Sequence, residues 1–202
     1  MTLPWRSLLL AVLAGGALAC GGSQPTPPDV FHRIAVPAPA ASDEALLPGV
    51  VEVERLGASD VLRARAMVLA DADRPDVLRR SDYHYWVDAP PVLVQDALVD
   101  YLRRTGLAGR VVTPEDRDDP SWIVSGRIRR FEQVRAGTAS RAHVAMELSL
   151  RVRSQRSLRV QGVYEATRPA AGPSAREGAE AMGAALGEIF EAFVADLRAA
   201  LP

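Results

Sequence analysis

The chemically reactive side chains of this 202-residue chain are few and far apart. The single cysteine, Cys20, excludes an intramolecular disulfide and a thiolate metal cluster. The three histidines, His32, His84 and His143, lie far apart, and none has a metal-type neighbour at helical spacing. The sequence contains no metalloprotease motif, serine-nucleophile elbow, phosphate loop or dinucleotide fingerprint. We therefore expect a non-catalytic protein without a metal or cofactor.

Cys20 stands at the end of a secretion signal. One positive charge at Arg6 precedes an apolar run that is shorter than the roughly 20 residues needed to span a bilayer. Ala19 places a small residue directly before the cysteine, and residues 21–28 form a proline-rich tether. This pattern resembles a bacterial lipoprotein signal, which implies that the mature chain begins at an acylated Cys20. An ordinary secretory signal that ends near a cysteine is the alternative.

The lipoprotein resemblance also implies a location. Gly21 follows the cysteine, where enteric lipoproteins retained in the inner membrane carry an aspartate. We thus expect a protein that is lipid-anchored on the periplasmic side of the outer membrane. Residues 1–19 would be the signal peptide, residues 20–28 the lipidated cysteine and flexible tether, and residues 29–202 a single periplasmic domain.

Composition restricts the partners of this domain. The 24 basic residues are all arginine and face 25 acidic residues, and aromatic residues make up only 5% of the chain. This balance argues against nucleic-acid binding. One group of arginines, however, falls on two predicted neighbouring strands: Arg127, Arg129, Arg151 and Arg153. Two interpretations stay open, a polar face balanced by Glu147 and Glu165 or a positive face for acidic partners and phospholipid headgroups.

The elements that must position these residues follow from hydrophobic periodicity. Strands are predicted at 30–36, 50–56, 65–70, 77–80, 83–87, 111–112, 122–134, 144–152 and 158–166, with a bulge between 128 and 131. The last three have short connections, which require antiparallel neighbours. We expect an α+β fold, a mostly antiparallel sheet of about five to seven strands with two main helices packed on one face.

Both helices have clear boundary signals. The first is predicted to be capped by Asp88, to carry Pro90 and Pro91 in its first turn and to end before Gly106. The second runs from about Ser174 to Ala200, and Ser174 forms a capping box with Glu177. Within the second helix, Gly183 and Gly187 stand four residues apart. We interpret this glycine pair as close packing of a soluble helix on the sheet.

One segment resembles a known family. It reads Tyr83-His84-Tyr85-Trp86-Val87-Asp88-Ala89-Pro90-Pro91, followed by Leu93, Leu98, Tyr101-Leu102-Arg103 and Gly106-Leu107. This run resembles the central motif of the ABC-type transport auxiliary lipoproteins of the PqiC type. Members share an aromatic strand that ends in tryptophan, a small or acidic pair with proline, and a helix with paired leucines. Arg65–Val68 is similar to the strand that precedes this motif.

The resemblance implies a function and its partners. It implies an auxiliary component of an MCE-type ABC transport system that supports phospholipid transport between the inner and outer membranes. The partners would be an MCE-domain protein, the transporter permease and ATPase complex, and the membrane through the lipid anchor. The motif residues Tyr83, Trp86, Asp88, Pro90 and Pro91 would contact a partner or fill the corner between strand and helix. Bound phospholipid and a homo-oligomer stay open.

Two other functional classes are weighed against this one. A structural or assembly lipoprotein would serve lipopolysaccharide export or cell-wall enzymes. A hydrolase with an unrecognised site is the third class. Neighbouring genes that encode a permease, an ATPase and an MCE protein would distinguish the transport role from the assembly role. Turnover by the purified protein that one polar substitution abolishes would indicate the hydrolase.

Overall fold

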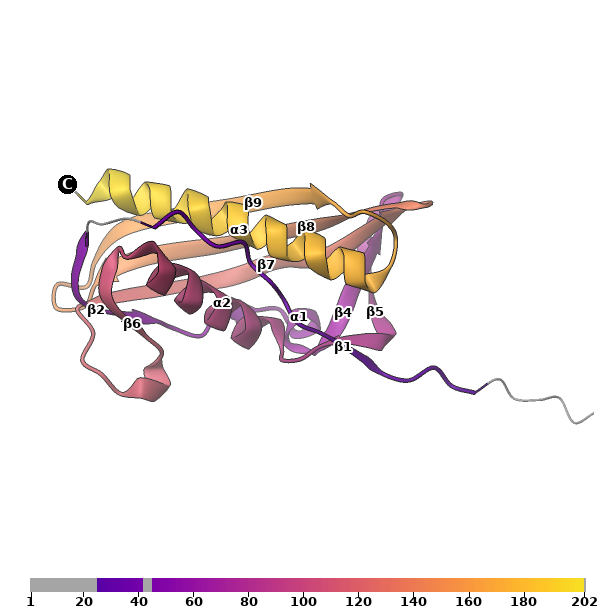
Figure 1. The fold of residues 1–202 in the computed structure, drawn as a ribbon, viewed down its shortest axis with the longest axis horizontal. Coiled ribbons are helices and arrows are strands. Elements are labelled where there is room, and N and C mark those ends of the chain that lie inside the picture. The colour runs from indigo at the N-terminus through magenta and orange to yellow at the C-terminus, as the bar shows by residue number, and fades with distance from the viewer. Residues whose placement is uncertain (1–24, 42–44, 202) are drawn as a thin grey trace, which may run out of the picture.

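In the computed structural model, residues 25–41 and 45–201 are described, and within them a curved nine-stranded sheet carries two long helices on one face (Figure 1). The strands are β1 (Val30–His32), β2 (Leu47–Val53), β3 (Gly57–Ala58), β4 (Ala66–Asp71), β5 (Arg74–Trp86), β6 (Ala108–Val112), β7 (Trp122–Ala136), β8 (Ala139–Val152) and β9 (Ser157–Pro169). The helices are α1 (Asp60–Arg63), α2 (Pro90–Thr105) and α3 (Ala175–Ala200), with a 3-10 turn, η2, at Pro114–Asp116. The predicted signal peptide and Cys20 lie outside the described residues.

The long strand β7 organises the sheet. On one side it pairs with β8, which pairs with β9, and both pairings are antiparallel. On the other side β2, β3 and β4 follow one another along its length, all parallel to it. Strand β6 extends the sheet from β2 in parallel, β5 pairs antiparallel with β4, and β1 pairs parallel with β5.

The sheet is therefore mixed, and the expectation of a mostly antiparallel sheet is wrong. The strands β7, β8 and β9 are connected by short turns and are antiparallel as predicted, and β4 and β5 form a further antiparallel hairpin. The parallel pairs join segments that are distant in sequence, and a local pattern carries no information on them. Strand β3 has no predicted counterpart, because its two residues are too few to show alternation, and the segments predicted at 77–80 and 83–87 belong to one strand, β5.

The hairpin strands carry the core as their alternation predicts. On β8, Val144, Met146, Leu148 and Leu150 are all fully buried. The pairing of β7 with β8 shifts register between Ile128 and Arg130, so the predicted bulge is confirmed. Helix α3 covers these strands with an apolar stripe that includes Met182, Leu186, Ile189, Phe190 and Phe193. Among the described residues, no helix has the length and apolar content to cross a membrane.

Helix α2 begins at its prolines but is not capped by Asp88, and that prediction is wrong. The N-cap position is Ala89, and no side chain caps the helix. Pro90 and Pro91 have no N–H to offer, and the next donor, the N–H of Val92, bonds to the carbonyl of Ala89 at 2.9 Å. The first turn thus leaves no donor for a capping carboxylate. Gly106 ends the helix in the left-handed conformation, as expected.

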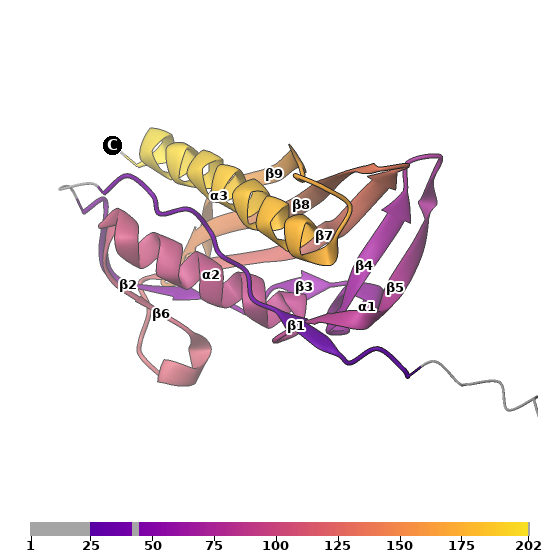
Figure 2. The same ribbon diagram turned by 45° about the vertical axis from the view of Figure 1, so that its right-hand side comes forward.

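Helix α3 has the predicted capping box, but its two glycines do not face the sheet. They face residues 34–41, an extended segment that we call the strap, which passes between α2 and α3 (Figure 2). A Cβ at Gly183 would overlap the carbonyl oxygen of Ala35, and a Cβ at Gly187 would lie 3.0 Å from Cδ of Pro37. The interpretation as packing on a sheet is therefore corrected, since these glycines let the strap approach the helix.

Candidate functional site at the edge formed by β1 and β5

Trp86, the tryptophan of the sequence motif, is a core residue. Its side chain is 1% exposed, and its ring centroid lies 5.3 Å from that of Phe131 on β7. Its backbone N–H donates to the carbonyl of Arg65 at 2.7 Å, and its own carbonyl accepts from Nε of Arg65 at 3.1 Å. The residue therefore closes the corner between β4, β5 and the start of α2.

The motif strand also holds β1, the first strand after the tether. Residues 30, 31 and 32 pair with 84, 85 and 86, and the N–H of Val87 donates to the carbonyl of His32 at 3.0 Å. The imidazoles of His32 and His84 are in hydrogen-bond contact, Nε2 to Nδ1 at 3.1 Å. Burial, and then the neighbouring His84, lowers the pKa of His32. The motif thus connects the N-terminal segment to the body of the domain.

Three side chains form a cluster on this edge, which we call the β1 patch: Phe31 and Arg65, which are exposed, and Tyr85, which is half-buried. Phe31 is 51% exposed, its ring lies 5.8 Å from that of Tyr85, and the guanidinium of Arg65 lies over it at 5.0 Å. An open cavity of about 660 Å³ adjoins the patch and is also lined by Asp29, Arg80 and Asp82. Aromatic residues and arginine are the types that dominate binding energy at protein interfaces.

The other predicted motif residues have local roles. Pro90 and Pro91 are buried in the first turn of α2. Asp88 is exposed, and its charge contributes to the raised pKa of Asp96, which is due first to burial. Tyr83 is half-buried on β5, two residues before Tyr85 of the patch.

The predicted arginine face is mostly neutralised. Arg129 forms an ion pair with Glu147, Arg151 lies 3.5 Å from Glu54, and Arg153 lies 3.7 Å from Asp119. Arg127 makes no ion pair within residues 25–41 and 45–201. Glu165, expected to balance an arginine, instead contacts His143 at 2.5 Å. The geometry favours a charge-balanced polar face over a positive surface.

Comparison with known proteins places this arrangement in a family. The model of the ABC-type transport auxiliary lipoprotein component matches residues 32–194, which include the motif, the strands β2 to β9 and most of α3. The chain belongs to this family. The family expected from the motif is thus confirmed. No curated protein matches the sequence.

Solved structures show a similar fold. Protein XCC0632 from Xanthomonas campestris, a DUF330 protein, is 16% identical with a TM-score of 0.71, over 82% of this chain and 92% of that chain. An uncharacterized protein is 12% identical with a TM-score of 0.66, over 86% of this chain and 99% of that chain. At these identities the likeness concerns the fold alone.

None of the three members of the β1 patch was identified from the sequence as a site residue, although Tyr85 lies within the motif. Phe31 lies on a three-residue strand whose pairing with β5 is parallel and non-local. Arg65 belongs to the segment that resembles the family strand, but its contact with Phe31 depends on that same pairing. A single exposed aromatic next to the tether was the only available signal, and it carries little information without the fold.

Proposed function

We propose that this auxiliary lipoprotein is anchored through Cys20 to the periplasmic face of the outer membrane and supports phospholipid transport by an MCE-type ABC system. The proposed role is non-catalytic. The observation that carries it is the match of the family model to residues 32–194. The signal-like run that ends at Cys20 supports the anchor and the compartment.

The β1 patch is the surface we assign to the MCE partner. Phe31 lies eleven residues after Cys20 in the sequence, so an extended chain separates them by roughly 35 Å at about 3.1 Å per residue. A patch at that distance from the anchor is presented to a protein that reaches across the periplasm toward the outer membrane. Exposed Phe31, supported by Tyr85 and Arg65, supplies the apolar and cationic contacts of such an interface.

Affinity capture from membranes tests this proposal. The mature lipoprotein should recover an MCE-domain protein together with the permease or the ATPase. Replacing Phe31 with alanine should weaken capture by about 30-fold, as expected for a hot-spot residue worth about 2 kcal/mol. Val163→Ala is the matched control, because Val163 is an exposed apolar residue, 62% exposed, on the distant strand β9. Recovery of no transporter component by the unmodified protein would refute the partner assignment.

The anchor is tested separately. Mass spectrometry of protein extracted from membranes should find an N-terminal Cys20 that carries acyl chains, and membrane fractionation should place the protein with the outer membrane. A chain that keeps residues 1–19 would refute both the anchor and the compartment.

A further inference from the structure

The strap is held against the two helices by apolar contacts alone, which makes it a segment that can be displaced. Its eight residues, Ile-Ala-Val-Pro-Ala-Pro-Ala-Ala, are all uncharged and aliphatic. No hydrogen bond joins residues 34–41 to any other described residue, although the strap lies between two helices. It is held by apolar contact, since Ile34 and Val36 pack against the core and Ala35 and Pro37 meet the two glycines of α3. Lifting it would break no hydrogen bond with the described protein.

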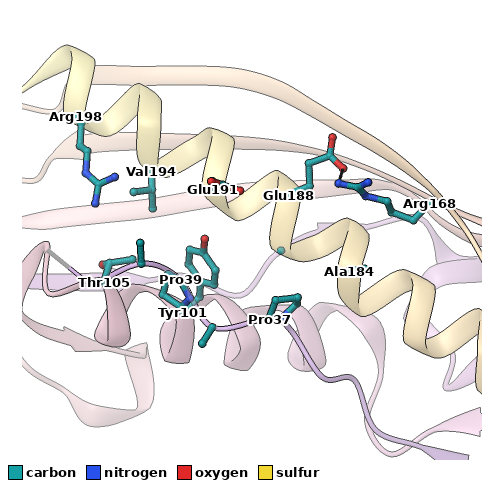
Figure 3. A pocket seen from close by; sticks show the side chains of 13 residues that line it. Pro37, Pro39, Tyr101, Thr105, Arg168, Ala184, Glu188, Glu191, Val194 and Arg198 are labelled. Carbon is teal, nitrogen blue, oxygen red and sulfur yellow. Dashed lines mark ion pairs between the residues drawn. The ribbon is translucent and has the colours of Figure 1, made fainter.

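Cavities adjoin the strap on both sides. One of about 360 Å³ lies between Pro37–Ala40, α2 and α3, and its lining side chains are drawn in Figure 3. Another of about 240 Å³ lies between Ile34–Pro37 and α2. The first volume alone is within the range of about 300–1,000 Å³ typical of small-molecule sites. The strap therefore fills only part of a longer groove between the helices.

The floor of this groove is apolar, and charged side chains line it along α3, where Glu191 and Arg198 make no ion pair with a described residue. Tyr101 of α2 and Phe190 of α3 meet edge-to-face with ring centroids 5.4 Å apart, and Gly187 and Val194 continue the surface along α3. At the end of the groove, Arg198 points from α3 toward α2 (Figure 3). Arg198 makes no ion pair with a residue in the described ranges, whereas Arg168 is paired with Glu188 at 2.7 Å.

We infer that the groove between α2 and α3 is a binding site for the acyl chain of an anionic phospholipid, and that the strap is its displaceable occupant. The ligand class rests on the proposed role in phospholipid transport. The groove accepts an unbranched apolar chain because its present occupant is an extended aliphatic segment without hydrogen bonds. The guanidinium of Arg198 supplies a contact for the phosphate at the open end.

The geometry at Gly187 gives a direct test. A Cβ on Gly187 would lie 3.7 Å from Cβ of Pro37, within the range of about 3.5–4.5 Å that a disulfide requires. The double variant Pro37→Cys/Gly187→Cys therefore locks the strap onto α3 when oxidised and releases it when reduced. Pro37→Ala/Gly187→Ala is the matched control, with the same added Cβ and no cross-link. Gly183→Ala acts in the opposite direction, because its methyl group overlaps the carbonyl of Ala35 and expels the strap.

The probe is a vesicle of phosphatidylethanolamine and phosphatidylglycerol that contains phosphatidylglycerol with a photoactivatable acyl chain. The full mature lipoprotein is reconstituted, illuminated and digested. Mass spectrometry then quantifies label on peptides from α2 and α3, separately from the acylated N-terminal peptide. A parallel arm with the photoactivatable fatty acid alone distinguishes a phospholipid from a free fatty acid.

We expect reduced protein to be labelled on both helices and oxidised protein to be labelled about tenfold less, because a locked strap leaves no population competent for binding. Gly183→Ala should increase the label. Equal labelling of the oxidised and reduced forms would overturn the inference, and so would labelling by the fatty acid only. Covalent dimers on oxidation would also overturn it, because the strap would then be exchanged between copies. If the lipid site is overturned in this way but the locked variant still captures the transporter, the proposed transport function stands and only the inference about the groove fails.

Discussion

Replacing Trp86 with alanine distinguishes the two roles that the sequence left open for this residue, which are contact with a partner and packing in the corner between strand and helix. The indole is 1% exposed and packs on Phe131, so the variant leaves a large cavity between β5 and β7. Such Trp→Ala changes cost about 3–5 kcal/mol, a range that includes part of the aromatic contact worth about 0.5–1.5 kcal/mol. A domain of this size is stable by about 5–15 kcal/mol, so the variant is expected to fold with a small margin.

The measurement is thermal and urea unfolding followed by circular dichroism. At about 2–4 °C per kcal/mol for 150–250 residues, Tm should fall by roughly 6–20 °C. Trp122→Ala is the matched control. Trp122 is half-buried, and its indole N–H donates to the carbonyl of Pro48 at 3.0 Å, so its loss should cost only about 1–2 kcal/mol.

The result that would refute this reasoning is a stable Trp86→Ala protein that no longer captures its partner. A change below about 1 kcal/mol would mean that the site is not part of the tightly packed core. Loss of capture at unchanged stability would assign the indole to the partner interface. Transporter capture at a temperature well below Tm therefore accompanies the unfolding measurement.

Three further predictions concern single sites. Stability should decrease with acid below pH 6.5, because burial lowers the folded-state pKa of His32, so the unfolded chain binds protons that the folded chain does not. This contribution is fully present above pH 6.5 and is lost as the pH falls through the folded pKa. His32→Gln, which keeps a polar group beside His84, should flatten the pH dependence of urea unfolding. Gly126→Ala should destabilise the domain by about 3 kcal/mol or more, because the new methyl group overlaps the carbonyl of Glu147 on β8, and unchanged urea unfolding would contradict that packing. Asp88→Ala should change the unfolding free energy by less than about 0.5 kcal/mol, since this exposed carboxylate caps no helix. A loss near 1 kcal/mol would show instead that Asp88 caps α2.

The features that the sequence predicted correctly depend on neighbours in the chain. Alternation placed the buried face of β8, and the capping box at Ser174 marked the start of α3. The family motif identified the segment around Trp86, although its side chain proved to be core. Each of these signals is carried by residues within a few positions of one another.

The features that the sequence missed depend on distant contacts. The partner of Gly183 is Ala35, a residue near the other end of the chain, and nothing local to α3 indicates it. The β1 patch requires the parallel pairing of Phe31 with Tyr85. The prediction of Asp88 as a cap failed for a different reason, because two successive prolines remove the donors that a cap needs.

The tether, the β1 patch and the strap form one continuous N-terminal segment, and this continuity links docking to the groove. Phe31 of the patch and Ile34 of the strap are three residues apart, which is about 10 Å of extended chain. Strand β1 is held by three residue pairs with β5 and by the contact between His32 and His84, while the strap beyond it has no hydrogen bond to the described chain. A partner that binds Phe31 therefore acts on the segment at the point where the strap begins. Because the strap continues directly from β1, we expect partner binding at Phe31 and opening of the groove to be coupled.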